Sequence, residues 1–269
     1  MLGASAYILE SDIFCRQIVK LFGSHNFGIR ARALYFIDSI RKLNLRYKTI
    51  LDAGCAEGYL SFYLAHKLKD SEIVGVDIDS EKIKKANEVA RHFNKKNLQY
   101  LEKDLNFLEQ QKIKADFIYS LDVMIYLKDD QGVLRQFYKC LDKKGLLFIH
   151  VPRESPVFNR PKLYFRRFLS FASKINLEKE NIFEQKIRAC YNQKDLENKI
   201  ISAGFQIIQE KITFGCLGMI AHTLFESIRS KSRIFHYLLL PLLLFLVYFD
   251  ILIPKKEGAG LAILAQKQS

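Results

Sequence analysis

The cysteines of this 269-residue chain form no pattern that would hold a metal ion or a disulfide framework. They are widely spaced, and none belongs to a Cys-x-x-Cys pair; the five are Cys15, Cys55, Cys140, Cys190 and Cys216. Because zinc sites and disulfide scaffolds need close, paired spacings, we expect neither, and we predict no metal ion. Residues 1–12 also lack the basic start and apolar core of a secretory signal. The expectation that follows is a reduced, cytoplasmic setting.

The longest apolar run is too short to predict a spanning helix. Residues 237–249 contain Pro241, and Asp250 and Pro254 end the run, whereas a spanning helix needs roughly 20 apolar residues. The chain has no internal repeat and no low-complexity tract. Hydrophobic residues make up 49% and charged residues 26%, which is the balance of a folded protein. At this length, one α/β domain with additions is a better prediction than two equal domains.

Positive charge is the strongest bias of the composition. Lysine and arginine number 42 against 29 acidic residues, which gives a formal net charge of +13. Nucleic acid and an anionic membrane surface are the two ordinary partners of such a chain.

Two short segments together predict a nucleoside-binding site. Residues 50–58 read Ile-Leu-Asp-Ala-Gly-Cys-Ala-Glu-Gly and lead into an amphipathic run at 59–68, which predicts a strand, a tight glycine turn and a helix. Glycine permits positive φ and lets a ligand approach the main chain. Residues 72–77 predict a second strand that ends in Asp77, at the edge where open α/β sheets bind ligands. A carboxylate there can accept both hydroxyl protons of a ribose.

Strand and helix patterns alternate along the middle of the chain, which predicts parallel pairing with right-handed crossovers. Strands are expected near residues 49–53, 72–77, 98–102, 115–121 and 145–151, with helices near 59–69, 80–93 and 130–141. A further helix and turn over 195–205 lead into a sixth strand, and a last strand is expected near 259–266.

These segments resemble the class I S-adenosylmethionine-dependent methyltransferases over about residues 45–212, together with the last strand. The resemblance implies an α/β fold, a Rossmann-like doubly wound sheet of seven strands whose last strand is antiparallel. N-terminal helices and a C-terminal apolar helical insertion are added to it here. The implied cofactor is S-adenosyl-L-methionine. The chain departs from the family pattern at Ala56, which replaces the middle glycine of the loop, and at Tyr126, where many relatives carry a histidine whose role therefore cannot be transferred.

The resemblance also implies which residues hold the cofactor. The glycine turn would cradle its methionine part, Asp77 its ribose and Asp104 its adenine amino group. The full predicted set is Asp52, Gly54, Ala56, Gly58, Asp77, Ile78, Asp104, Leu105 and Leu121.

Catalysis is predicted at His150, at the end of the fifth strand, and at Tyr126, in the loop after the fourth. Each has a structural alternative, because a histidine there is equally often a hydrogen-bonding group and the tyrosine can simply line a pocket. Asp122, on the same loop, shares that second alternative.

Three other residues have open or structural interpretations. Asp79 either assists Asp77 or caps the helix that begins at Ser80. His222 is expected to be structural, and Cys55 to fill space inside the glycine turn.

The predicted organisation has two parts. Residues 1–48 are an N-terminal helical extension, either packed beside the sheet or forming a lid. Residues 49–269 are the methyltransferase domain, with a basic and aromatic insertion at 152–192 on the acceptor side and an apolar insertion at 213–258 that contacts a membrane. The apolar insertion fits a segment lying in the membrane interface and flanked by basic residues. The alternative is a helix buried against the sheet or in a dimer contact.

The leading functional hypothesis is a methyltransferase for a membrane-associated acceptor, such as a lipid or a lipid-linked sugar. It would be a peripheral or monotopic protein of the cytoplasmic face, with a membrane surface or lipid-like acceptor as partner and no nucleic acid. An RNA methyltransferase is suggested by the charge, but the loop after the fourth strand lacks an Asn/Asp-Pro-Pro-aromatic motif. A nicotinamide dehydrogenase would need Gly-x-Gly-x-x-Gly, which the turn lacks. A non-catalytic membrane-associated protein of the same fold is the remaining alternative, and the oligomeric state is open.

Overall fold

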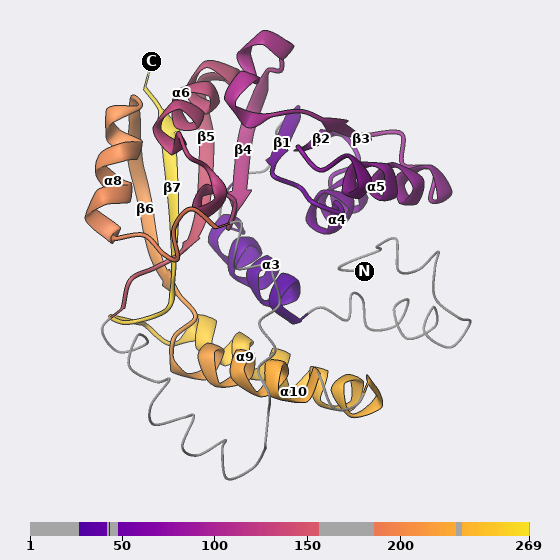
Figure 1. The fold of residues 1–269 in the computed structure, drawn as a ribbon, viewed down its shortest axis with the longest axis vertical. Coiled ribbons are helices and arrows are strands. Elements are labelled where there is room, and N and C mark those ends of the chain that lie inside the picture. Colours follow the sequence, from indigo (N-terminus) through magenta and orange to yellow (C-terminus); the bar gives the residue numbers. More distant parts are fainter. Residues whose placement is uncertain (1–26, 42, 44–47, 156–185, 230–232, 269) are drawn as a thin grey trace.

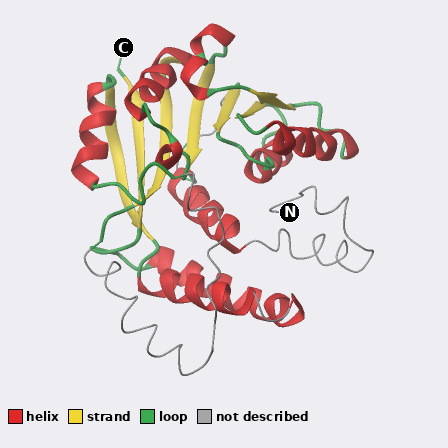
Figure 2. Cartoon of the chain, in the orientation of Figure 1, coloured by secondary structure: helices red, strands yellow, loops and turns green. Residues whose placement is uncertain are grey.

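A central sheet with helices on both faces organises the chain (Figures 1 and 2). The computed structural model describes residues 27–41, 43, 48–155, 186–229 and 233–268. Within them the sheet has seven strands in the order β3-β2-β1-β4-β5-β7-β6. The strands are β1 Thr49–Ala53, β2 Glu72–Asp77, β3 Leu98–Glu102, β4 Ala115–Leu121, β5 Leu141–Pro152, β6 Phe205–Thr213 and β7 Gly260–Lys267.

Strands β1 to β5 pair in parallel, whereas β7 runs antiparallel to both β5 and β6. The predicted seven-stranded Rossmann-like sheet with an antiparallel last strand is therefore confirmed. Because β5 and β6 both oppose β7, the carboxyl end of β6 lies at the same edge of the sheet as the carboxyl ends of the parallel strands.

The described helices are α3 Phe27–Ile40, α4 Tyr59–Lys67, α5 Ser80–His92, α6 Asp130–Cys140, α8 Gln193–Ser202, α9 Cys216–Arg229 and α10 Arg233–Leu252. Side chains of α3, α4 and α5 share one core layer with the sheet, and those of α6 and α8 share the other. Three short 3₁₀ helices, η1 Leu105–Phe107, η2 Glu109–Gln111 and η3 Met124–Tyr126, lie in loops.

The predicted bounds of β1 to β4 agree with the structure, but β5 begins four residues earlier than expected. Leu141 pairs with Ala115 before a shift of register, and regular pairing resumes at Leu146 opposite Phe117. Polar residues 142–144 hid this start, because they lie exposed on the strand. The 3₁₀ helices were not predicted, since three residues are too few to show a hydrophobic period.

Helix α3 is fixed to the sheet by aromatic packing. The buried ring of Phe36 lies 4.9 Å from the ring of Tyr119 and 5.0 Å from that of Phe148, between centroids. Aromatic pairs at these separations add to the free energy gained from burial alone. The helix thus packs across β4 and β5, and it begins at Phe27 and ends at Ile40.

Helices α9 and α10 lie beyond the carboxyl edge of the sheet, because they connect the end of β6 to the start of β7 (lower part of Figure 1). A third core cluster joins them to α3, and it includes Phe27, Tyr35, Phe225, Leu243 and Val247. The N–H groups of Gly215 and Gly218 at the start of α9 donate to the carboxylate of Asp250 over 3.0 and 3.1 Å. Asp250, the acid that ends the apolar run of the sequence, is a buried residue inside α10.

The outward side of α10 carries large apolar side chains. We call this surface the α10 face, and its residues are each at least 40% exposed: Leu238, Leu242, Phe245, Tyr248, Phe249 and Leu252. In the part of the chain that the structure describes, no helix combines the length and the apolarity needed to cross a bilayer.

Parts of the predicted organisation lie outside the described residues. They are residues 1–26, 42 and 44–47 of the extension, residues 156–185 of the acceptor-side insertion, and residues 230–232 of the apolar insertion.

Candidate active site

The turn after β1 adopts the left-handed backbone that its glycines were expected to allow. Gly54 and Gly58 have φ of 85° and 74°, and Ala56 has φ of 48°. A Cβ atom at Gly54 would clash with the side chain of Val123, and one at Gly58 with the ring of Tyr100. Glycine is therefore required at both positions, while the small side chain of Ala56 tolerates an angle that larger residues rarely adopt.

Asp77 joins the end of β2 to this turn. Its Oδ2 accepts a hydrogen bond from the N–H of Ala56 at 2.8 Å, and its Oδ1 accepts one from the N–H of Asp79 at 3.0 Å. Each carboxylate oxygen can accept a second hydrogen bond. The side chain of Ile78, next in sequence, is 70% exposed. An acid beside an exposed apolar side chain fits a nucleoside, because the acid suits ribose hydroxyls and the apolar group suits a base.

The end of β3 adds a second acid to the same edge, since β3 pairs with β2. Asp104 caps η1 by accepting from the N–H of Asn106 at 2.9 Å, and Leu105 behind it is buried. Leu121, at the end of β4, is partly buried against the core. The structure thus brings these predicted residues to the strand ends around the turn, and their contacts with a cofactor stay predictions.

Asp52 lies beneath the turn. It is buried, and its Oδ2 accepts a hydrogen bond from the hydroxyl of Ser61 in α4 at 2.5 Å. Burial raises the pKa of Asp52 to about 7. These contacts point to support of the β1–α4 turn from below, and direct contact with a cofactor stays a prediction.

Asp122 is the centre of a partly buried set of linked polar side chains at the end of β4. It forms an ion pair with Arg32 of α3, and its Oδ1 lies 2.7 Å from Nδ1 of His150. The Nε2 of His150 lies 2.9 Å from the hydroxyl of Thr213, the last residue of β6. His150 is only 3% exposed. The predicted catalytic histidine therefore has protein partners at both ring nitrogens.

Opposing effects set the pKa of the Asp122 carboxylate. Burial acts to raise the pKa of Asp122, but the charge of Arg32 and the contact with His150 outweigh it and hold the pKa below its ordinary value. Asp122 is therefore ionised at neutral pH.

Tyr126, the other predicted catalytic residue, ends η3 and is 40% exposed. Partial burial and the nearby charge of Asp122 raise the pKa of its phenol. Its hydroxyl stays protonated at neutral pH, so it can donate a hydrogen bond to an incoming group.

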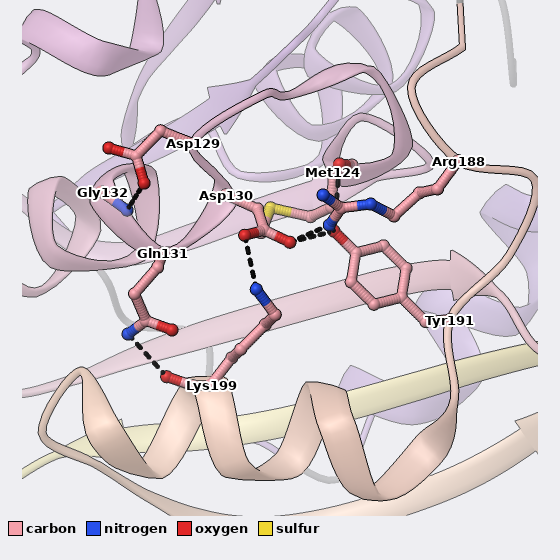
Figure 3. A network of polar contacts seen from close by, with 8 residues as sticks. All are labelled: Met124, Asp129, Asp130, Gln131, Gly132, Arg188, Tyr191 and Lys199. Carbon is pink, nitrogen blue, oxygen red and sulfur yellow. Dashed lines mark hydrogen bonds and ion pairs between the residues drawn. The ribbon is translucent and has the colours of Figure 1, made fainter.

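A second polar cluster anchors the backbone beside η3 (Figure 3). The carboxylate of Asp130 accepts from Lys199 Nζ and from the hydroxyl of Tyr191, both at 2.7 Å, and it pairs with Arg188. The hydroxyl of Tyr191 is also 3.1 Å from the carbonyl oxygen of Met124. This cluster ties residues 188–191, where the acceptor-side insertion returns to the fold, to the loop that carries Tyr126.

The remaining sequence interpretations are also placed. Asp79 caps α5 by accepting from the N–H of Lys82 at 3.1 Å, while its own N–H donates to Asp77. Cys55 is buried, and burial raises the pKa of its thiol well above the ordinary value. His222 lies between the rings of Phe27 and Phe214, at centroid distances of 6.4 and 6.3 Å.

The burial of His222 leads us to expect that the protein loses stability in acid. Burial lowers its pKa to about 4, so the unfolded state binds more protons as the pH falls from the ordinary histidine value toward 4. The free energy of unfolding should fall by up to about 3 kcal/mol across that window. We expect His222→Phe to lose less stability there, as measured by urea unfolding at pH 7 and 4.5. The exposed His92→Asn is the control, and equal losses in wild type and His222→Phe would contradict the prediction.

Sequence reasoning missed Arg32, Thr213 and the Asp130 cluster. Arg32 carried no signal, because it is one of several arginines on a helix outside the recognised motifs. Thr213 is recognisable only by its place at the end of β6, opposite Gly260 of β7.

Comparison with known proteins agrees with this geometry. A family model described as a methyltransferase domain matches residues 46–206, more than half of the chain. The tRNA U34 carboxymethyltransferase of Aliarcobacter butzleri (strain RM4018) is 31% identical over 108 residues, which are 39% of this chain and 34% of that protein. The match thus spans about a third of the length of this curated relative.

Solved structures share the fold at low sequence identity. The Haemonchus contortus phosphoethanolamine N-methyltransferase 2, in complex with phosphomonomethylethanolamine and S-adenosylhomocysteine, gives a TM-score of 0.58 at 16% identity, over 97% of this chain and 61% of that one. The plantazolicin methyltransferase BpumL, in complex with S-adenosylhomocysteine, gives 0.56 at 17% identity, over 98% and 94%. With the family model, the sheet order and the glycine turn, they lead to one conclusion: the chain belongs to the class I S-adenosylmethionine-dependent methyltransferase family.

Proposed function

We propose that the protein transfers a methyl group from S-adenosylmethionine to an acceptor associated with a membrane. The observation that carries the membrane part is the exposed α10 face, which lies on the segment inserted at the carboxyl edge of the sheet. The proposed division is an extension at 1–48 and a domain at 49–269 with insertions at 152–192 and 213–258.

The turn at residues 54–58 and the acid Asp77 would hold the cofactor, with Ile78, Asp104, Leu105 and Leu121 around its base. S-adenosylmethionine supplies an electrophilic methyl group on a sulfonium, whose leaving group is already good. The tasks left to the protein are to align the acceptor and exclude water.

On the acceptor side we assign different roles to the two predicted catalytic residues. Tyr126 is exposed and can hydrogen-bond the acceptor through its phenol. His150 is buried, and direct contact with an acceptor would require its ring to give up Thr213 or Asp122. Its contacts support a positioning role, in which it holds Asp122 and the loop after β4.

The α10 face has the properties of a helix that lies in a membrane interface. Five of its residues, 238, 242, 245, 249 and 252, recur three or four positions apart, with Tyr248 beside Phe249, and so form one stripe. Leu240, Leu243 and Val247 on the inner side are buried. Such a stripe is too apolar for an ordinary water-exposed surface. The net charge of +13 would favour the anionic lipid of a cytoplasmic membrane face.

Flotation tests the docking. We expect wild-type protein to float with vesicles containing anionic lipid, and Leu242→Glu/Phe245→Glu to stay in the buffer, since each charge opposes insertion of the apolar stripe. The matched control is Ile201→Glu/Ile208→Glu, two side chains exposed to a similar degree on α8 and β6, which should float like wild type. Equal flotation of both variants would contradict docking through α10. A wild-type protein that stays in buffer as a dimer would instead support a dimer contact.

The reaction is tested by incubating the protein with methyl-labelled cofactor and a membrane lipid extract. We expect label in the lipid fraction. If no fraction becomes labelled, the result would favour a non-catalytic protein of the same fold.

RNA methylation is the second candidate function. It is supported by the charge and by the named activity of the tRNA-modifying relative. A parallel incubation with total tRNA distinguishes the two functions, because label in tRNA but not in lipid would overturn the membrane acceptor.

A further inference from the structure

On the basis of the proposed function, we infer that Arg32 of α3 is a positioning residue for the methyl-transfer site, although it lies before the methyltransferase domain. Its guanidinium contacts Asp122 across 90 positions of sequence. No motif of the family model's region contains it, since that region begins at residue 46.

Asp122 is the point through which Arg32 can act on both halves of the site. The backbone of Asp122 has φ of +58°, a conformation that needs support from its surroundings. The next residue, Val123, fills the space above Gly54 so closely that no Cβ would fit there. Three residues further on, Tyr126 ends η3. A displacement of Asp122 would therefore disturb the cofactor turn and the exposed phenol together.

The other side of Asp122 is held rigidly. Its N–H donates to the carbonyl oxygen of His150 at 2.8 Å, and the ring of His150 is in turn held by Thr213. A Cβ at Gly260 would clash with Thr213, so β7 packs directly behind this pair. Strands β5, β6 and β7 thus fix His150 in place. The ion pair with Arg32 is different, because it depends on one side chain that is 34% exposed.

Helix α3 also connects this contact to the docking helices. Tyr35 lies one turn after Arg32, and its hydroxyl donates to Asp250 of α10 at 2.5 Å. Arg32, which contacts the site, and Tyr35, which contacts α10, are thus three positions apart on the same helix. Helix α10 thereby helps to set the position of Arg32.

The charged and titratable groups around Asp122 predict a pH dependence for variants of Arg32. They are Arg32 from α3, His150 from β5, His222 from α9 and Tyr126 from η3. Removal of the Arg32 charge takes away a cause that lowers the pKa of Asp122 and leaves burial, which raises it, opposed only by the contact with His150. Asp122 would then become protonated at a higher pH than in wild type, and its contact with His150 would weaken as the pH falls.

The test measures S-adenosylhomocysteine affinity by calorimetry at pH 8 and pH 5.5. We expect Arg32→Gln to bind about tenfold more weakly than wild type at pH 8, with a ratio that widens at pH 5.5. Arg32→Lys keeps the charge and should recover affinity to within about threefold of wild type at both values. Arg41→Gln, which removes an exposed arginine paired with Asp38, is the matched control and should bind like wild type.

A double-variant cycle shows whether Arg32 acts through Asp122. In an Asp122→Asn background, Arg32→Gln should weaken binding by less than about twofold, because its partner charge is already gone. Wild-type affinity in Arg32→Gln at both pH values would overturn the inference. So would a loss that is independent of pH, unrescued by lysine and additive with Asp122→Asn, since that is the behaviour of a merely structural residue. A wild-type protein with no affinity for S-adenosylhomocysteine would instead overturn the proposed function itself.

Discussion

Replacing Asp77 with alanine should weaken S-adenosylhomocysteine binding by about 10²- to 10³-fold, because two charge-assisted hydrogen bonds to a ribose would be lost together. The carboxylate also holds the turn after β1 through the N–H of Ala56. The variant therefore loses both a direct contact and the backbone shape that places the cofactor. Calorimetric titration of the purified variant measures the effect.

The fold should survive this change. The two N–H groups that donate to Asp77 belong to Ala56 and Asp79, which are only partly buried, so water can replace the carboxylate. Asp77→Asn should also bind weakly, because its amide group turns a hydrogen-bond donor toward groups that are donors themselves. The exposed Asp195→Ala on α8 is the control. Binding within about threefold of wild type in Asp77→Ala would contradict the nucleoside site.

The strand ends of the site could be predicted because they rest on local signals. Apolar runs of the length of a strand, each followed by a glycine or an acid, gave β1 with its turn and β2 with Asp77. The parallel sheet then requires that these ends meet at one edge.

The polar chain through Asp122 could not be predicted in the same way. Arg32, Asp122, His150 and Thr213 come from four elements, and only tertiary packing brings them together. A charged residue on a helix outside the motifs carries no periodicity that would reveal its partner. The Asp130 cluster could not be predicted for the same reason, since 58 to 69 positions separate Asp130 from Arg188, Tyr191 and Lys199.

The apolar insertion was understood in part. Its composition predicted an apolar helical segment, and α10 is such a helix, with large apolar side chains exposed along the α10 face. The role of Asp250 was missed, because nothing in the local sequence shows that this acid, inside a helix that continues to Leu252, is buried against the start of α9.

Replacing Asp250 with alanine should destabilise the protein by about 3–5 kcal/mol, the range expected when one partner of a buried ionic network is removed. The carboxylate accepts from the N–H groups of Gly215 and Gly218 at the start of α9 and from the hydroxyl of Tyr35. Lys255, whose Nζ lies 3.3 Å from it, is also buried. Alanine would leave two backbone donors and a hydroxyl without their acceptor, and it would take the counter-charge from Lys255, whose Nζ keeps the carbonyl oxygens of Asp250 and Ile253.

Urea unfolding of Asp250→Ala measures this loss, and the exposed Asp142→Ala on β5 is the control, which should differ from wild type by less than about 0.5 kcal/mol. Asp250→Asn keeps one acceptor oxygen, so its free energy of unfolding should lie between those of Asp250→Ala and Asp142→Ala. Because Asp250 joins α9 and α10 to α3, the alanine variant should also weaken S-adenosylhomocysteine binding, through the displacement of Arg32. Wild-type stability in Asp250→Ala would show that the packing of Phe27, Phe225 and Val247 alone holds these helices, and that α3 is positioned without them.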